Sequence, residues 1–302
     1  MPFNTVASLS HSRRALFSTL QSGSKFTNNF KAYLVDDKGK PGSFFHDVPL
    51  SLNSADRTAT MVVEIPRYTQ GKFEISKELP FNPIVQDTKK GKLRFVNNVF
   101  PFHGYPYNYG ALPQTWEDPT TSTAENKGFF GDNDPLDVVE IGGSLGKLGQ
   151  VKTVRILGAL ALIDDGEMDW KIIAVDALDP LAPKLVNGIK DIEKVMPAAL
   201  DGLRKWFKNY KRPTGKPENA FAFGGEYLDA DTAMKIVEQC HSRWSKLIQG
   251  EVDAKRKCLP QIANTTLIGT PGLTGEARPE IEEAGKERSI SEEVNTVYYF
   301  KD

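Results

Sequence analysis

The sequence predicts a mainly β protein with α-helices (α+β): an OB-like five-stranded β-barrel with packed helices and long terminal extensions. Three observations predict this fold class. Short runs of β-branched and aliphatic residues, separated by turn signals, fill residues 31–175 without an intervening helix. Helical periodicity begins only after these runs, and the composition changes again at both ends of the chain.

The expected strands are short runs that are separated by turns in the first part of the chain and bounded by glycine or aspartate in the later part. They cover residues 31–35, 61–65, 72–75, 93–96, 138–141, 151–163 and 170–175. Turn signals at 37–39, 70–71 and 90–91 (Asp-Lys-Gly, Gln-Gly and Lys-Gly) separate the earlier strands. Many short strands in succession favour a barrel over a sheet with alternating helices.

Three later segments, 189–196, 199–208 and 231–249, have the period of an α-helix. The third is the clearest, because its apolar residues form one stripe. This stripe consists of Ala233, Ile236, Val237, Cys240, Trp244, Leu247 and Ile248. We expect the three helices to pack on the outside of the barrel.

The N-terminal segment differs from the rest of the chain. Residues 1–30 are rich in serine, threonine and basic residues such as Arg13 and Arg14, and the first acidic residue of the chain is Asp36. This composition is typical of a mitochondrial transit peptide. It predicts a mitochondrial protein, in the matrix; a plain disordered N-terminus on a cytoplasmic protein is the alternative.

The remainder is expected to form one main domain, residues 31–260, followed by an extended C-terminal tail, residues 261–302. Within the tail, residues 264–296 are rich in glycine, proline and glutamate and show no periodicity. The aromatic residues 298–300 are candidates to pin the tail to the body.

The composition excludes several function classes. The chain has 302 residues, and its 38 Lys and Arg nearly balance its 39 Asp and Glu, so its net field is too weak to hold nucleic acid or an anionic membrane. Its longest apolar run, 154–163, is about half of what a membrane-crossing helix needs. Cys240 and Cys258 form no CxxC pair, so we expect neither a disulfide framework nor a cysteine zinc site.

Two groups of acidic residues point to a metal site. The first is Asp132, Asp134 and Asp137, in Gly-Asp-Asn-Asp-Pro-Leu-Asp. Because like charges this close repel, cations are needed to neutralise them, and hard oxygen donors favour magnesium or calcium over zinc. An EF-hand is excluded, because Asp137 and Gly143 occupy the positions where its loop requires glycine and glutamate.

The second acidic group spans residues 164–169 and precedes Lys171. A hairpin there places Asp164 and Asp169 opposite each other, where they can share metal ions with the first group. Each group taken alone also fits a solvated turn, and that alternative stays open at this point.

Basic and phenolic residues lie before and after these two groups in the sequence. They are the side chains that hold phosphate oxygens beside metal ions. Together with two glutamates on strand-like runs, they are Glu64, Lys72, Glu74, Arg94, Tyr105, Tyr109, Tyr210 and Lys211. Composition alone does not distinguish a phosphate site from surface charges and packed rings.

Residues 31–250 closely resemble the soluble family I inorganic pyrophosphatases, in their eukaryotic branch. The resemblance rests on Asp-x-Asp-Pro-x-Asp at 132–137, Val-Val-Glu-Ile-Pro-Arg at 62–67, and the long motifs at 82–95, 108–119 and 215–219. The basic, serine-rich N-terminus further resembles the mitochondrial, fungal type.

The resemblance implies a role for each matching residue. Asp132, Asp137 and Asp169 would hold the activating magnesium ion, Asp137 would bridge to a second ion, and Asp164 and Glu64 would receive ions that arrive with the substrate. The phosphates would be held by Lys72, Arg94, Tyr109, Lys171, Tyr210 and Lys211. Asp134 would be the general base, Tyr105 a polar group nearby, and Glu74 a carboxylate behind the metal ligands.

The implied reaction is hydrolysis of inorganic pyrophosphate to two orthophosphates by a magnesium-activated water, without a covalent intermediate. Several Mg²⁺ ions are implied in each site, and other divalent ions can substitute. The resemblance also implies a homodimer, with no nucleic-acid partner and no membrane insertion.

Two rival functions are weaker. Gly-Gly-Ser-Leu-Gly around Ser144 matches a serine-hydrolase motif, but a strand-like run follows where that motif requires a helix. An OB-like barrel also suits a nucleic-acid binder, which the near-neutral charge and the acidic groups oppose. His46, His103 and His241 lack metal-ligand spacing and are expected in packing or surface roles.

Overall fold

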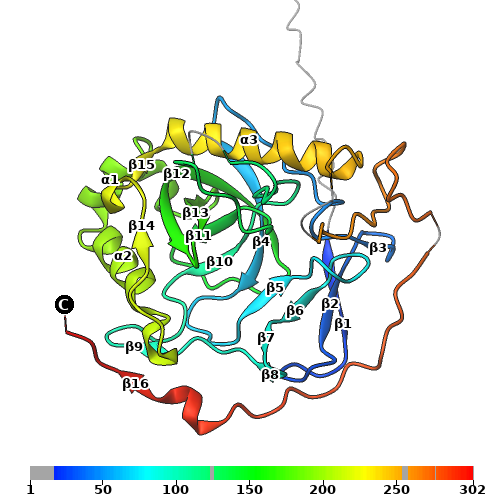
Figure 1. Cartoon of the computed structure of the whole chain (residues 1–302), viewed down its shortest axis with the longest axis horizontal. Helices are drawn as coiled ribbons and strands as arrows, with labels where there is room; N and C mark the ends of the chain where they lie inside the picture. The colour runs from blue at the N-terminus through cyan, green and yellow to red at the C-terminus, as the bar shows by residue number, and fades with distance from the viewer. Residues whose placement is uncertain (1–16, 123–125, 254–257, 276, 302) are drawn as a thin grey trace, which may run out of the picture.

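A closed ring of five strands forms the centre of the computed structural model, which describes residues 17–122, 126–253, 258–275 and 277–301 (Figure 1). In ring order these are β4 (Thr58–Ile65), β10 (Asn108–Ala111), β11 (Asp137–Glu140), β13 (Glu167–Asp176) and β12 (Val151–Asp164). Strand β12 pairs with both β13 and β4, which closes the ring. The predicted five-stranded barrel is confirmed.

One barrel strand, β10, was not among the predicted strands. It is short and contains Gly110, which has no apolar side chain to contribute to an alternating pattern. The glycine is required by the close approach of β4, because a Cβ at this position would lie 1.9 Å from the carbonyl oxygen of Val62. Tertiary packing, and not local propensity, therefore places this strand.

A second sheet lies beside the barrel. Its strands are β1 (Ser18–Ser22), β2 (Lys31–Val35), β3 (Pro41–Gly42), β6 (Ile84–Gln86) and β5 (Phe73–Ile75), whose paths run side by side in Figure 1. Smaller pieces are the hairpin β7 (Thr88–Lys89) and β8 (Lys92–Leu93), and β14 (Ala220–Phe221) and β15 (Leu228–Asp229), which add to β12.

The prediction of a strand at residues 93–96 is wrong for three of these four residues, 94–96. Strand β8 ends at Leu93, and only an isolated bridge between Gly71 and Phe95 follows. The backbone N–H of Arg94 donates to Asp87, whereas that of Val96 donates to Gln70. Because successive residues pair with different segments, the run is a link between two sheets and not a continuous strand.

All three predicted helices are present: α1 (Ile189–Val195), α2 (Ala199–Asn209) and α3 (Ala230–Ile248). Helix α3 begins at Asp229, whose side chain accepts a hydrogen bond from the backbone N–H of Thr232. The helix packs on β12, and Figure 1 shows it running across the upper side of the barrel. Over the described part of the chain there are also four short 3₁₀ helices, at Ala182–Lys184, Arg212–Thr214, Phe223–Gly225 and Glu292–Asn295.

Alternate residues of the barrel strands pack into two hydrophobic clusters. One cluster holds Met61 and Val63 of β4 together with residues of α3, and the other holds Val62 together with Trp206 and Phe207 of α2. This alternation follows from the two-residue period of a strand. Among the described residues, no helix has the length and apolar character needed to cross a membrane.

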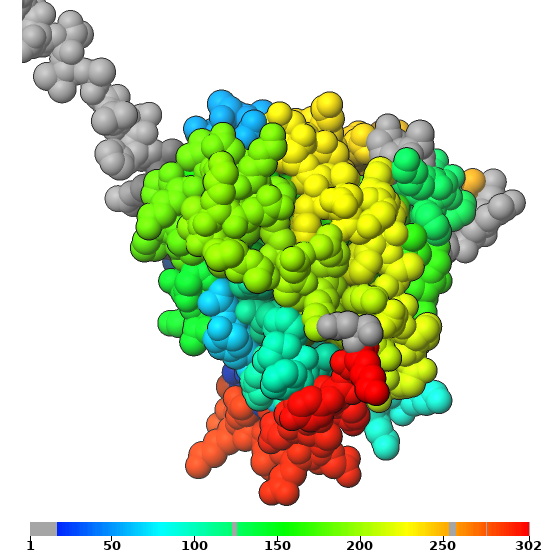
Figure 2. All heavy atoms as spheres, turned by 90° about the vertical axis from the view of Figure 1, so that its left-hand side faces the viewer, coloured from blue at the N-terminus to red at the C-terminus, as the bar shows by residue number. Residues whose placement is uncertain are grey.

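The C-terminal tail runs along the outside of the second sheet and below helices α1 and α2 (Figures 1 and 2). Near its end, β16 (Val297–Tyr298) pairs in parallel with β9 (Asn98–Val99). Tyr299 stacks on Phe100 with ring centroids 5.3 Å apart, and the guanidinium of Arg212 lies 4.1 Å from the ring centroid of Phe300. The terminal aromatic residues thus attach the tail to the body.

The expected N-terminal extension is described only in part. Residues 1–16, with Arg13 and Arg14, lie outside the described residues. Residues 18–22 form β1, which pairs along its length with β2.

Candidate active site

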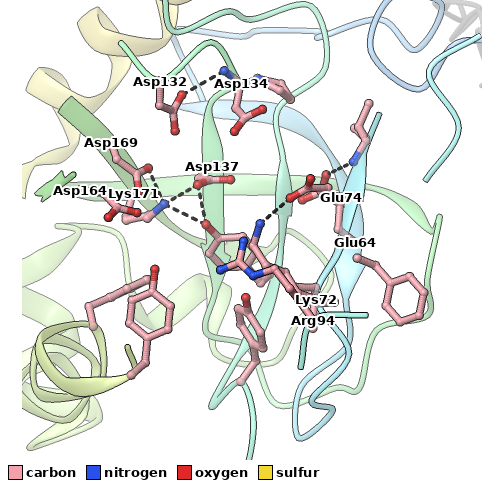
Figure 3. A pocket seen from close by; sticks show the side chains of 18 of the residues that line it. Glu64, Lys72, Glu74, Arg94, Asp132, Asp134, Asp137, Asp164, Asp169 and Lys171 are labelled. Carbon is pink, nitrogen blue, oxygen red and sulfur yellow. Dashed lines mark hydrogen bonds and ion pairs between the residues drawn. The ribbon is translucent and has the colours of Figure 1, made fainter. Parts of the chain in front are cut away.

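One pocket lies where β4, β10, β11 and β13 meet the segment that follows α2. Every residue that the sequence predicts for the site lines it (Figure 3). They are Glu64, Lys72, Glu74, Arg94, Tyr105, Tyr109, Asp132, Asp134, Asp137, Asp164, Asp169, Lys171, Tyr210 and Lys211. In Figure 3, Asp132 and Asp134 lie above Asp137, and Lys72 and Arg94 lie below it. The pocket therefore has an acidic end and a basic end.

The acidic end is formed by Asp132, Asp137 and Asp169. Asp132 comes from the loop before β11, Asp137 from the start of β11, and Asp169 from β13. Burial and the neighbouring carboxylates raise the pKa of Asp132 well above its usual value. Burial likewise raises the pKa of Asp169 to about 7, although the Lys171 ammonium beside it acts in the opposite direction.

Lys171 connects two of these carboxylates. Because β11 and β13 run parallel with Asp137 beside Lys171, the ammonium reaches Asp137 and also Asp169, two residues earlier on its own strand. It also donates to the hydroxyl of Tyr109, 2.9 Å away, and that hydroxyl donates to Asp137. The network holds these side chains in place before any ligand arrives.

The β12–β13 hairpin differs from expectation in its register. Asp164 pairs with Glu167, and Asp169 pairs with Leu162, so Asp164 and Asp169 are not directly opposite each other. The two-residue turn at 165–166 fixes this register. Since side chains alternate along a strand, Asp164 and Asp169 still share one face as diagonal neighbours. Asp164 also forms an ion pair with Lys211.

The basic end consists of Lys72 and Arg94, which a shared carboxylate holds together. Asp87 accepts from the Lys72 ammonium at 2.9 Å and from the Arg94 guanidinium. These two cations lower the pKa of Asp87, against the effect of its burial. Lys72 also pairs with Glu74 on β5.

Two further carboxylates have distinct partners. Glu64 is buried at the end of β4 and accepts a hydrogen bond of 2.7 Å from the backbone N–H of Ile75. Burial raises its pKa well above the usual value. Asp134 is partly exposed and forms an ion pair of 2.6 Å with Lys77.

Three tyrosines line the pocket, and an aromatic group anchored on α2 supports them. Tyr210 stacks on Trp206 with ring centroids 4.9 Å apart, and Tyr105 lies 5.0 Å from the same indole ring. The indole N–H of Trp206 donates to the carbonyl of Gly104 at 3.1 Å. Burial raises the pKa of Tyr105 to about 12, so its phenol stays protonated at neutral pH.

Sequence reasoning missed three residues at this site: Lys77, Asp87 and Glu117. Glu117 forms a group with Asp132 and Asp169, in which one carboxylate oxygen from each lies within 4.8 Å of the others. Asp87 and Glu117 belong to the family-like motifs at 82–95 and 108–119, and membership of these motifs is the sequence signal that could have identified them. Neither lines the pocket: they lie beside lining residues, and this placement depends on contacts with distant segments, which no local pattern reveals.

This arrangement suits a small, highly charged anion bound together with cations. Oxygen donors gather at the acidic end, as hard divalent cations prefer, and ammonium and guanidinium groups gather at the basic end, as phosphate oxygens prefer. The pocket holds no cysteine or histidine, so its donor set does not suit zinc.

Comparisons with known proteins agree with this chemistry. Residues 61–245 match the family model described as inorganic pyrophosphatase. The mitochondrial inorganic pyrophosphatase of Saccharomyces cerevisiae is 50% identical over 299 residues, covering 98% of this chain and 93% of that protein.

The solved structures that resemble this chain belong to the same family. The inorganic pyrophosphatase of Schistosoma japonicum has a TM-score of 0.86 at 40% identity, covering 94% of this chain and 100% of that one. An N-terminally truncated vacuolar soluble pyrophosphatase of Trypanosoma cruzi, in complex with PPi, has a TM-score of 0.72 at 36% identity, covering 82% of this chain and 97% of that one. The chain therefore belongs to the inorganic pyrophosphatase family, whose enzymes are hydrolases of inorganic pyrophosphate.

Proposed function

We propose that the chain hydrolyses inorganic pyrophosphate with a magnesium-activated water, Asp134 acting as general base and no covalent intermediate forming. The observation that carries this proposal is the single pocket with carboxylates at one end and phosphate-binding cations at the other. The Trypanosoma cruzi relative, whose structure is described as a complex with PPi, supports pyrophosphate as the substrate.

The residues of the acidic end fit divalent magnesium. All the donors there are carboxylate oxygens, and one buried oxygen of the neighbouring Glu117 has no hydrogen-bond partner among the described residues. Asp132, Asp137 and Asp169 would hold the first ion, with Asp137 shared with a second, and Asp164 and Glu64 would receive further ions. Magnesium, when bound, lowers the pKa of water and neutralises charge on the phosphate oxygens.

The protein's own side chains bind the phosphate groups and accept the proton. Lys72, Arg94 and Lys211 bind and orient the phosphate groups, and each already lies beside a carboxylate that sets its direction. Lys171, Tyr109 and Tyr210, which line the same pocket, donate to further phosphate oxygens. Asp134 accepts the proton of the attacking water, because it is a partly exposed carboxylate lining the pocket and is held in place by Lys77.

Glu74 and Tyr105 have supporting roles in the proposed site. Glu74 positions the Lys72 ammonium with which it pairs. Tyr105 packs against Tyr109 and Trp206 and contributes a neutral hydroxyl to the pocket.

The first test is phosphate release from pyrophosphate by the purified chain with magnesium, with a chelator, and with Asp134→Asn. We expect release that requires magnesium and falls about 10²–10⁴-fold in kcat in the variant, the range for loss of a general base. Asp201→Asn is the matched control, because Asp201 is an exposed aspartate on α2 that pairs with Arg204 outside the pocket. Full activity of Asp134→Asn would remove Asp134 from the role of base.

We also propose that residues 1–30 contain a mitochondrial transit peptide, that 31–260 form the catalytic domain and that 261–302 form an extended tail. The composition of the N-terminus and the mitochondrial relative in yeast support mitochondrial targeting. The pairing of β1 with β2 favours a cleavage before Ser18. Import of the full chain by isolated mitochondria, with residues 1–16 deleted as control, tests this; equal import of both forms would contradict it.

A homodimer is our last proposal here, and it rests on the family resemblance. Light scattering coupled to size-exclusion chromatography should give about twice the mass of 33.5 kDa for the full chain. A monomer at micromolar concentration would contradict it.

A further inference from the structure

Glu117 lies behind the acidic end of the pocket, and it differs from the other buried carboxylates. Its side chain is 2% exposed, and it lies in the segment before the loop that carries Asp132 and Asp134. One carboxylate oxygen, Oε1, accepts a hydrogen bond of 3.0 Å from the backbone N–H of Trp170. The other oxygen, Oε2, has no hydrogen-bond partner among the described residues.

The backbone of Glu117 fixes the first acidic loop. Its N–H donates to the carbonyl of Asp134 and its carbonyl accepts from the N–H of Asn133, both at 2.9 Å. Gly131 packs so closely that a Cβ there would lie 2.4 Å from the Glu117 carbonyl oxygen. One residue therefore joins the loop of Asp132 and Asp134 to the strand of Asp169 and Lys171, since Trp170 lies between the latter two.

A buried carboxylate oxygen without a partner costs free energy, and here other carboxylates surround it. The ion pairs of the described residues include neither Glu117 nor Asp132. Carboxylate oxygens of Glu117, Asp132 and Asp169 lie within 4.8 Å of one another. Without metal, such an arrangement is relieved only by protonation; a bound cation, with the water molecules that it holds, supplies both the missing positive charge and the missing donors.

We propose that Glu117 is a positioning residue of the magnesium site, whose free oxygen faces the hydrated divalent cation beside Asp132 and Asp169. Magnesium keeps several of its waters when it binds proteins, and those waters need acceptors such as this oxygen. Glu117 would thereby orient the cation while its backbone orients the ligand loop. The inference rests on the proposed magnesium requirement.

The test uses Glu117→Gln, which keeps the size of the side chain and an oxygen for the N–H of Trp170. Its amide would replace the free oxygen with a donor that can pair with Asp132 or Asp169. We therefore expect a higher melting temperature than wild type in chelator. We also expect Mg²⁺ affinity, measured by calorimetry without pyrophosphate, to fall about 10–100-fold, as for other groups that orient metal ligands.

The matched control is Glu140→Gln. Glu140 is equally buried, but both its oxygens have partners outside the pocket, including Lys152 and Asn108. We expect this variant to lower the melting temperature in chelator and to leave Mg²⁺ affinity at the wild-type value. If Glu117 had only a structural role, Glu117→Gln would lower the melting temperature. A higher melting temperature in chelator together with a lower Mg²⁺ affinity therefore indicates a role at the metal site.

Two results would overturn the inference while leaving the proposed function in place. They are unchanged Mg²⁺ affinity in Glu117→Gln, and a loss of melting temperature in chelator like that of Glu140→Gln. If instead the wild-type chain binds no Mg²⁺, the proposed function fails together with the inference.

Discussion

The two ends of the pocket differ in how far the protein balances its own charge. At the basic end, Lys72 and Arg94 share Asp87 as a partner, and Lys72 also pairs with Glu74. At the acidic end, Lys171 serves both Asp137 and Asp169, while Asp132 has no ion pair among the described residues. The acidic end is therefore incomplete without cations, whereas the basic end is already neutralised.

Because of this difference in charge balance, we expect the acidic end and the basic end to respond differently to cations and to phosphate. A cation entering the acidic end relieves repulsion between carboxylates, so its binding should stabilise the fold strongly. A phosphate entering the basic end must compete with carboxylates that already hold the lysine and arginine side chains. Metal binding should therefore precede tight binding of pyrophosphate.

The largest expected effect comes from removing the central carboxylate of the acidic end. Asp137→Ala removes the carboxylate that Lys171 and Tyr109 both contact. We expect kcat for pyrophosphate hydrolysis to fall at least about 10³-fold, because the metal and phosphate groups would lose their common support. Phosphate release at saturating Mg²⁺ measures it, with Asp201→Asn as control, and a loss smaller than tenfold would contradict the assignment.

A smaller effect is expected at the basic end. Arg94→Lys keeps the charge but loses the planar group that contacts Asp87 and is suited to bidentate binding of phosphate. We expect kcat/KM to fall about 10–100-fold, while Mg²⁺ affinity measured without pyrophosphate stays at the wild-type value. A parallel loss of Mg²⁺ affinity would show that the two ends are not independent.

The acidic end should also respond to pH. The pKa of Asp169 is raised to about 7 in the folded chain, above its value of about 3.9 in an unfolded chain, so the metal-free fold binds an extra proton between these values. Without metal, this group therefore makes the fold less stable as pH rises from about 4 to 7.

Because magnesium requires the ionised carboxylate, Mg²⁺ affinity should rise about tenfold between pH 6 and pH 8, with release of protons on binding. Calorimetry in two buffers of different ionisation enthalpy measures this release. Affinity that does not change with pH would place the magnesium ion away from Asp169.

The smallest effect is expected from the tail. Its backbone accepts hydrogen bonds from the side chains of Gln70 and Asn98, next to the segment that carries Lys72 and Arg94. Deleting residues 294–302 removes these contacts and the aromatic contacts of Tyr299 and Phe300. We expect about 1–2 kcal/mol lower stability in urea and unchanged Mg²⁺ affinity. A change in Mg²⁺ affinity would mean that the tail supports the acidic end as well.

Local patterns predicted much of this molecule because they reflect local causes. Strands β2, β4, β11, β12 and β13 and all three helices follow from periodicity, which depends only on which side of an element faces the core. The site residues were found together because their motifs resemble those of one family, and the pocket contains all of them.

Tertiary structure alone decided the remaining features. The strand β10 exists because Gly110 lets β4 approach closely, and the diagonal placement of Asp164 and Asp169 depends on the register of a hairpin. The pairing of Asp87 with two cations and the free oxygen of Glu117 arise between segments far apart in the chain. The physical reason is that charge balance and burial are properties of the assembled pocket, whereas periodicity and turn chemistry are properties of neighbouring residues.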